Sequence, residues 1–209
     1  MKKKLFLGVY NPSIILTYIS VFCSTYGLGQ LALYDENSSI NILSLCMALL
    51  AVAGVCDMFD GKVARMCKRT EQEKKFGIQL DSLADTVSFV IFPAVMLMFM
   101  CRFHIASFIV SCFYVFAGIM RLGWFNVITE ENQGVYFGLP VTFAALIFPS
   151  AYVILKHFGL NISGLFSLIL YTIVSILFIS NFKFKKPTLK FTIVMILVAI
   201  LVITGLLIF

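Results

Sequence analysis

The sequence predicts an all-α fold, a polytopic integral membrane bundle of about six or seven transmembrane helices. Of the 209 residues, 61% are hydrophobic and only 12% are charged, and the mean hydropathy is +1.01. A soluble domain of this length does not need so much apolar surface. Apolar runs of about 18 residues or more are typical of helices that cross a bilayer. Because such runs recur with short connections, we expect one membrane domain over residues 1–209.

Seven apolar runs are the candidate spans. They cover residues 13–34, 39–60, 83–101, 104–122, 139–156, 160–180 and 191–209. Pro12 precedes the first run, and Pro140 lies in the first turn of the fifth, where proline is tolerated. The basic run Lys183–Lys190 precedes the last span and is expected to anchor it at the membrane surface.

The first residues of the chain combine three lysines with a short apolar stretch, which could indicate a signal peptide. The Asn11-Pro12 break and the lack of a small-residue cleavage site argue against one. We therefore expect residues 1–12 to form an interfacial segment that leads into the first span.

The basic residues predict the orientation in the membrane. With the N-terminus inside and seven spans, Arg102 and Lys156 fall outside, and the other 14 of the 16 Lys and Arg residues fall inside. The formal net charge of +6 then indicates attraction to anionic lipid head groups and phosphates, not to nucleic acid. We expect a multi-pass protein of the cytoplasmic membrane.

Two pairs of aspartates stand where a membrane-embedded chain has little reason to place charge. Asp57 and Asp60 end the second run, and Asp81 and Asp85 flank the start of the third. A carboxylate near a bilayer costs several kcal/mol unless it is paired, metal-bound or facing water. Each pair has helical spacing, so its members share one helix face. Residues 57–85 are therefore the candidate catalytic motif, which covers two helices and a loop facing the cytoplasm.

Carboxylates that share one space repel each other unless they hold one or two cations. Oxygen-only ligands suit hard ions such as Mg²⁺, Mn²⁺ or Ca²⁺ rather than a structural zinc. Gly61 and Ala64 leave room for a large group near the backbone, and Lys62 and Arg65 add positive charge. This combination favours a pyrophosphate-bearing nucleotide as the ligand. The alternative, aspartates that only pair with nearby Lys and Arg at a membrane end, fits a single residue better than four.

The pattern D-x-x-D-G-x-x-A-R from Asp57 to Arg65, followed by G-x-x-x-D-x-x-x-D from Gly77 to Asp85, resembles the signature of the CDP-alcohol phosphatidyltransferase family. Every defining position is present. The spacer between the two halves, residues 66–76, is eleven residues long and exceeds the usual length in the family. We therefore expect a slightly longer cytosolic turn there.

Within the family, the chain is most similar to bacterial phosphatidylserine synthases. The similarity lies in residues 81–89, in Arg121 with Phe125-Asn126, and in residues 137–140, and it extends over about residues 11–145. The usual N-terminal pattern Pro-Asn-x-x-Thr is partly kept, because Asn11-Pro12 stands in reversed order and Thr17 is present.

The resemblance implies a reaction and its groups. A phosphatidyl group would pass from CDP-diacylglycerol to the hydroxyl of L-serine, with release of CMP. Divalent cations, two Mg²⁺ or Mn²⁺ ions, would be bound by Asp57, Asp60, Asp81 and Asp85. Asp85 would also be the general base. The nucleotide or CDP-lipid would be bound by Gly61, Ala64, Arg65, Gly77 and Thr17.

Weaker candidates for contact with the acceptor or a phosphate are Arg121, Asn126 and Lys62. For Arg121 the alternative is an arginine that reaches from an aromatic belt to the membrane surface. The resemblance further implies a homodimer embedded among membrane lipids.

Two other functions stay open. One is the same chemistry with another acceptor: choline, glycerol 3-phosphate or an inositol phosphate. The other is a non-enzymatic transporter with a cation site, although this chain gathers its acids at one edge and offers no acidic path across the bilayer.

Overall fold

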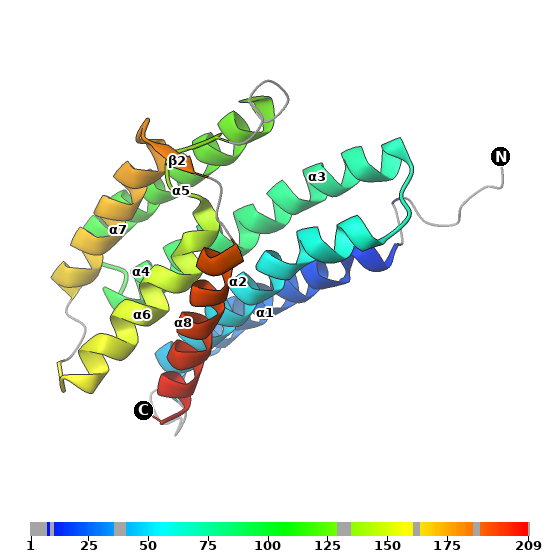
Figure 1. Ribbon diagram of the computed structural model, residues 1–209. Helices are drawn as coiled ribbons and strands as arrows, with labels where there is room; N and C mark the ends of the chain where they lie inside the picture. Colours follow the sequence, from blue (N-terminus) through cyan, green and yellow to red (C-terminus); the bar gives the residue numbers. More distant parts are fainter. Residues whose placement is uncertain are drawn as a thin grey trace.

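The computed structural model describes residue 8 and residues 11–35, 41–128, 135–160, 164–185 and 189–208. They form a bundle of helices with one pair of short strands (Figure 1). The predicted helical membrane bundle is confirmed. Of the expected interfacial segment 1–12, only Gly8, Asn11 and Pro12 are among the described residues.

The main helices follow the predicted apolar runs in order. They are α1 (Ile15–Ala32), α2 (Ile42–Met66), α3 (Glu71–Asp85), α4 (Phe92–Met100), α5 (Ile105–Ile128), α6 (Ala144–His157), α7 (Gly164–Ile179) and α8 (Leu189–Ile208). Single 3₁₀ turns precede α1 and α6, namely η1 (Pro12–Ile14) and η3 (Val141–Phe143). A π-helical segment, η2 (Thr86–Ile91), joins α3 to α4 without a break.

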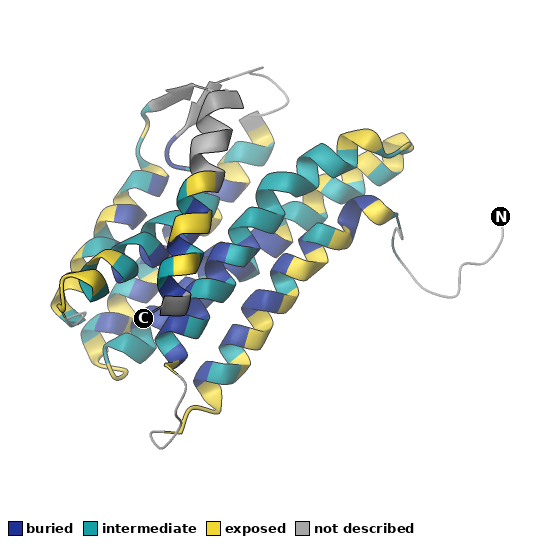
Figure 2. Cartoon of the chain, turned by 60° about the horizontal axis from the view of Figure 1, so that its bottom comes forward, coloured by how far each residue is buried: buried dark blue, intermediate teal, exposed yellow. Residues whose placement is uncertain are grey.

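Among the described residues, four helical stretches are long and apolar enough to cross a membrane. They are Pro12–Ala32, Ile42–Met66, Glu71–Met100 and Ile105–Val127, and shorter apolar helices cover Val141–His157, Gly164–Ile179 and Leu197–Leu206. Figure 2 shows buried residues gathered inside the bundle and exposed residues on its outer sides. Many exposed side chains are large and apolar, such as Phe22, Ile109 and Phe116, as expected of a surface that faces lipid.

The connection between α2 and α3 differs from the prediction. We expected a longer turn over residues 66–76, but only residues 67–70 lie outside helix, and α2 and α3 run beyond the predicted spans 39–60 and 83–101. The physical reason is a capping box: Thr70 Oγ1 accepts from the Glu73 N–H at 3.3 Å, and the Glu73 carboxylate accepts from the Thr70 N–H at 2.7 Å. An ion pair between Lys74 and Glu71 at 2.6 Å adds to the first turn.

The regular α-helix stops at η2 because of Pro93. In an α-helix the carbonyl of Phe89 would accept from the N–H four positions on, which is the position of Pro93. Proline has no N–H, and its ring crowds that carbonyl. The chain widens instead, and the Phe92 N–H bonds to the Val87 carbonyl in the π pattern.

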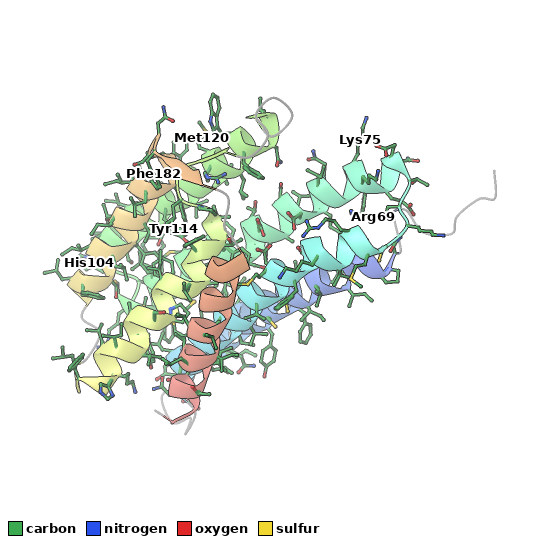
Figure 3. The ribbon with its side chains drawn as sticks, in the orientation of Figure 1. Arg69, Lys75, His104, Tyr114, Met120 and Phe182 are labelled. Carbon is green, nitrogen blue, oxygen red and sulfur yellow. The ribbon has the colours of Figure 1, made fainter. Side chains whose placement is uncertain are left out.

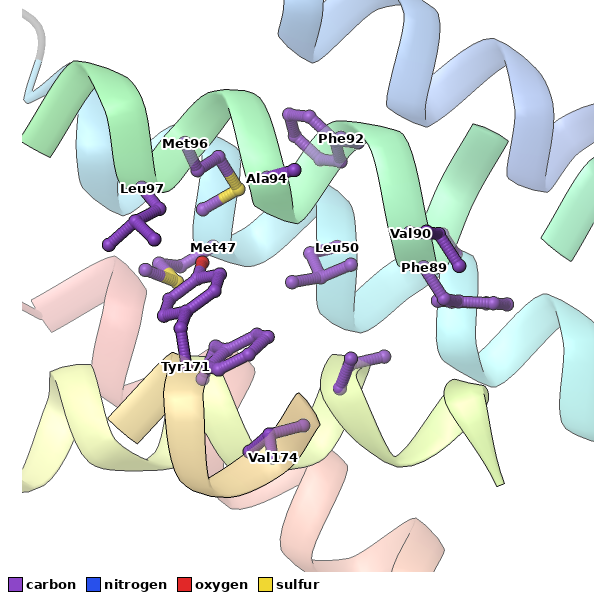
Figure 4. Packing of buried hydrophobic residues seen from close by; sticks show 14 of the residues in the cluster. Met47, Leu50, Phe89, Val90, Phe92, Ala94, Met96, Leu97, Tyr171 and Val174 are labelled. Atoms are coloured by element: carbon purple, nitrogen blue, oxygen red, sulfur yellow. The ribbon is translucent and has the colours of Figure 1, made fainter. Parts of the chain in front are cut away.

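Aromatic rings form the centre of the second half of the bundle. Tyr114 of α5, Phe148 of α6, and Tyr171 and Phe178 of α7 are almost fully buried. The rings of Phe148 and Tyr171 stack with centroids 3.9 Å apart. Figure 4 shows Tyr171 facing Met47 and the helix that carries Leu97. These ring contacts pack α5, α6 and α7 against one another.

Strands β1 (Val135–Phe137) and β2 (Lys183–Lys185) pair antiparallel, with Tyr136 opposite Phe184. The backbone continues this link, because the Gly138 N–H donates to the Phe182 carbonyl at 2.9 Å. Gly138 has a φ of +69°, and a Cβ there would lie 2.6 Å from the Phe178 carbonyl oxygen. The pair therefore ties the α5–α6 connection to the end of α7.

Candidate functional site

The structure brings the predicted aspartates together from two helices. Asp57 and Asp60 lie on α2, and Asp81 and Asp85 lie on α3. Carboxylate oxygens of Asp57, Asp81 and Asp85 all lie within 4.8 Å of one another. Asp60 is also close enough to Asp81 for their carboxylate charges to repel each other. The acid cluster, as we call these four residues, is therefore one site built from both halves of the motif.

Asp60 stands slightly apart from the other three. It is not in the trio whose oxygens converge. Its Oδ2 accepts a hydrogen bond from Oγ1 of Thr17 on α1, at 3.1 Å. Thr17 is buried, so this bond fixes the Asp60 carboxylate from a third helix. Thr17, which we expected at the nucleotide, thus reaches the site through an aspartate.

The acid cluster is poorly compensated by the protein itself. Asp85 is buried, with 8% of its surface exposed, and the other three are half-buried. Within the described residues, none of the four forms an ion pair with a lysine or arginine. This finding counts against the interpretation of ordinary paired charges at a membrane end. Converging carboxylate oxygens without a basic partner fit a hard divalent cation.

The predicted nucleotide-binding residues of α2 and α3 lie along these helices between the aspartates and the α2–α3 turn. A Cβ built on Gly61 would have Arg65 Nη1 as its nearest neighbour, at 3.7 Å. A Cβ built on Gly77 would have Arg69 Nη1 at 3.5 Å. Among the described residues, the side chain that comes within 4 Å of such a Cβ is in each case the end of a flexible arginine. Ala64, also on α2, carries a single methyl group. Figure 3 shows Arg69 and Lys75 near the end where α2 joins α3.

The weaker candidates lie in different surroundings. Lys62 extends over the ring of Phe59, with its Nζ 5.0 Å from the centroid, and forms no ion pair with the acid cluster among the described residues. Arg121 is buried in α5, and its guanidinium lies 5.1 Å from the centroid of Phe125.

Asn126 makes a contact that the sequence did not predict. Its Nδ2 donates to Ser82 Oγ at 2.9 Å, and Ser82 Oγ in turn lies 3.2 Å from Asn126 Oδ1. Ser82 directly follows Asp81 on α3. Asn126 therefore links the end of α5 to the helix that carries two of the aspartates.

Sequence reasoning also missed a hydrogen bond between two buried serines, one of which follows Asp85 by three residues. Ser20 Oγ of α1 donates to Ser88 Oγ of η2 at 3.1 Å, and both are buried. The signal was present in the spacing, because Ser20 follows Thr17 by three residues and so shares its helix face. A serine inside an apolar run is too common to single out without the structure.

Helices able to cross a membrane, together with a convergent acid cluster, define an integral membrane protein with a candidate cation site. The family model described as CDP-alcohol phosphatidyltransferase matches residues 10–208. The chain therefore belongs to the CDP-alcohol phosphatidyltransferase family.

Similar proteins carry related names. The CDP-diacylglycerol--serine O-phosphatidyltransferase of Helicobacter pylori is 31% identical over 140 residues, which are 66% of this chain and 56% of that protein. The archaetidylserine synthase of Methanothermobacter thermautotrophicus is 33% identical over 145 residues, 69% of this chain and 59% of that protein. A Mycobacterium tuberculosis CDP-diacylglycerol--serine O-phosphatidyltransferase is 29% identical over 149 residues, 67% and 51% of the two chains. The chain thus spans little more than half the length of these curated relatives.

Proposed function

We propose that this chain transfers the phosphatidyl group of CDP-diacylglycerol to the hydroxyl of L-serine, which forms phosphatidylserine and releases CMP. The observation that carries the proposal is the convergence of Asp57, Asp81 and Asp85 within 4.8 Å, in a chain that belongs to this family. The names of its relatives in Helicobacter pylori and Methanothermobacter thermautotrophicus support serine as the acceptor.

The acid cluster is proposed to hold the divalent cations, two Mg²⁺ or Mn²⁺ ions, through Asp57, Asp60, Asp81 and Asp85. When bound, the cations would neutralise the pyrophosphate and stabilise the departing CMP. Thr17 keeps the Asp60 carboxylate in place by its hydrogen bond at 3.1 Å. No lysine or arginine in the described part of the chain pairs with these carboxylates, so their oxygens are available as ligands.

Asp85 is proposed as the general base. A serine hydroxyl is a poor nucleophile and needs a base within hydrogen-bond reach. Asp85 accepts the hydroxyl proton while the serine oxygen forms its bond to the phosphatidyl phosphorus. The bond from that phosphorus to the CMP oxygen breaks, and CMP leaves with the electron pair. The burial of Asp85 supports this role, because it keeps competing water away from the reacting hydroxyl.

The CDP group is proposed to lie against α2 and α3 beside the acid cluster. Gly61, Ala64 and Gly77 present little or no side chain there, so the nucleotide can approach the backbone. Arg65 Nη1 lies 3.7 Å from the position that a Cβ on Gly61 would take. The guanidinium would turn from there to contact a phosphate.

The acceptor is proposed to bind between α3 and α5. Arg121 and Asn126 lie on α5, and Asn126 is already linked to Ser82 beside Asp81. A buried guanidinium at Arg121 suits the carboxylate of serine. Lys62 remains a candidate for a phosphate because it is half-exposed on α2.

The setting of the reaction is part of the proposal. The chain would form a single domain over residues 1–209 in the cytoplasmic membrane, with residues 1–12 at its surface and the motif facing the cytoplasm. It would act as a homodimer among membrane lipids.

The test is CMP release by the purified protein in detergent with CDP-diacylglycerol and Mn²⁺ or Mg²⁺. Serine, choline, glycerol 3-phosphate, inositol phosphate or no acceptor is added in parallel. Metal-dependent release driven by serine alone is expected. If another of these alcohols drives the release, that alcohol and not serine is the acceptor. Folded protein that fails to bind the CDP-lipid would overturn the proposed site.

A further inference from the structure

The π-helical segment η2 accepts hydrogen bonds from hydroxyl groups of two different helices, α1 and α5. Ser20 Oγ of α1 donates to Ser88 Oγ at 3.1 Å. The hydroxyl of Tyr114 of α5 donates to the Phe89 carbonyl at 2.8 Å. All four residues are buried. Figure 3 labels Tyr114, and Figure 4 shows Phe89 and Val90 on the helix that it meets.

The bond from Tyr114 replaces one that the sequence removes. Pro93 cannot donate to the Phe89 carbonyl, and this segment lies within the membrane-crossing stretch Glu71–Met100. A backbone carbonyl without a donor costs several kcal/mol in a bilayer, where no water can replace it. The Tyr114 hydroxyl gives this carbonyl a donor from another helix, at the point where the regular α-helical bond is missing.

Glycines allow both helices to come this close. A Cβ on Gly118, one turn after Tyr114 on α5, would lie 2.7 Å from Val90 Cγ2. A Cβ on Gly27, two turns after Ser20 on α1, would overlap the ring of Phe92. Helix α5 thus brings one hydroxyl and one glycine to η2, while α1 brings one hydroxyl to η2 and one glycine to the first residue of α4. Both helices therefore pack closely on this part of the chain.

The two contacted residues lie on the turn that follows Asp85. Ser88 and Phe89 are three and four positions beyond it, so they lie within one π-helical turn of Asp85. Moving η2 would therefore move the Asp85 carboxylate relative to the acid cluster. We propose that Ser20 and Tyr114 are positioning residues, which hold η2 so that Asp85 stays in register with Asp57 and Asp81; the inference rests on the proposed role of Asp85.

The chain offers a matched control for Tyr114. Tyr171 is buried to the same extent in the same aromatic cluster, with ring centroids 5.3 Å apart. Its hydroxyl has no hydrogen-bond partner among the described residues. Tyr114→Phe and Tyr171→Phe therefore remove the same atom from the same surroundings, and only the first removes a bond to η2.

The experiment measures kcat and KM for CMP release, and separately the binding of Mn²⁺ alone by electron paramagnetic resonance. Tyr114→Phe is expected to lower kcat about tenfold with KM values nearly unchanged, because a small displacement of a catalytic group slows the reaction more than it weakens binding. It is expected to weaken Mn²⁺ binding severalfold. Tyr171→Phe should leave both quantities at the wild-type level. Equal values of kcat and Mn²⁺ affinity in the two variants would overturn the proposal.

A second pair of variants keeps the test open if Tyr114→Phe does not fold. Ser20→Ala removes the bond to Ser88, whereas Ser24→Ala removes a buried bond within α1, from Ser24 Oγ to the Ser20 carbonyl at 3.0 Å. We expect a lower kcat only for Ser20→Ala. Adding Pro93→Ala to Tyr114→Phe restores a backbone donor, which should recover thermal stability without recovering kcat. Recovery of both would show a merely structural role and overturn the proposal.

The two proposals fail in different ways. If the wild type releases no CMP with any acceptor, the proposed function fails, while the Mn²⁺ affinities of the Tyr114 and Tyr171 variants still test the positioning of Asp85. If serine drives CMP release in all four variants at the wild-type kcat, the proposed function stands and the positioning inference is wrong.

Discussion

Near the aspartate motif, α1, α2 and α3 meet through polar side chains, whereas α5, α6 and α7 meet through aromatic rings. In the first group, Thr17 bonds to Asp60 and carboxylates of α2 face those of α3. In the second, Phe148 stacks on Tyr171 at 3.9 Å. Polar contacts are directional and hold atoms in place, while ring contacts fill volume. We infer that the first region positions ligands and that the second stabilises the fold. Substitutions in the first should therefore lower activity, and substitutions in the second should lower stability.

The largest effect is expected at the acid cluster. Asp85→Asn should lower kcat about 10³-fold, within the range that a general base contributes, and should leave unfolding in detergent unchanged. Asp57→Asn removes a proposed metal ligand that is not the base, so it should instead weaken the binding of CDP-diacylglycerol. The two variants are compared by CMP release and by binding of CDP-diacylglycerol. If Asp85→Asn weakens CDP-lipid binding as much as Asp57→Asn does, the separate base role is wrong.

The aromatic region should show the opposite behaviour. Phe148→Ala is expected to lower the free energy of unfolding by about 3 kcal/mol, because a cavity replaces a buried ring. The kcat per folded molecule should stay close to the wild-type value. The measurement is a denaturant titration in micelles beside an activity assay at a temperature where the variant is folded. A fall in kcat with an unchanged free energy of unfolding would contradict the proposed difference between the two regions.

A smaller effect is expected from the single hydrogen bond to Asp60. Thr17→Val removes a bond of about 1 kcal/mol, so Mn²⁺ affinity should fall roughly fivefold. Thr172→Val is the matched control in α7, because Thr172 Oγ1 bonds at 2.7 Å to the Leu168 carbonyl of its own helix. Calorimetric titration with Mn²⁺ compares the two. Equal Mn²⁺ affinities of the two variants would show that the Thr17 bond does not contribute to the cation site.

The smallest effect is expected at the turn. Thr70→Ala removes the capping side chain of α3, which is worth about 1 kcal/mol of local helix stability. Amide exchange in the first turn of α3 should speed up, with kcat and Mn²⁺ affinity unchanged. A drop in Mn²⁺ affinity would mean that the end of the hairpin helps to hold the aspartates.

The sequence predicted the apolar helices and the meeting of the two aspartate pairs, because both depend on local periodicity. The predicted turn over residues 66–76 was wrong, because the charges between Lys68 and Lys75 are typical of a loop, whereas the capping box of Thr70 begins the helix at Glu71. It did not predict η2, because the consequence of Pro93 depends on a donor, Tyr114, that comes from another helix. Nor could it pair Asn126 with Ser82, a contact 44 positions apart in the chain.

The short turn at residues 67–70 bears on how this hairpin can change over evolutionary time. The ends of α2 and α3, together with the start of α1, extend beyond the rest of the bundle (Figure 1), and Asn11 Nδ2 donates to the Lys68 carbonyl at 3.5 Å. The aspartates lie farther from the turn, where Thr17 of α1 bonds to Asp60. Residues inserted or deleted at the tip would change how far the hairpin reaches and its contact with Asn11, since the packed parts of the helices keep their rotation. The longer spacer of this chain then requires no compensating change among the carboxylates. Lineages can therefore drift in hairpin length while the chemistry at its base stays the same.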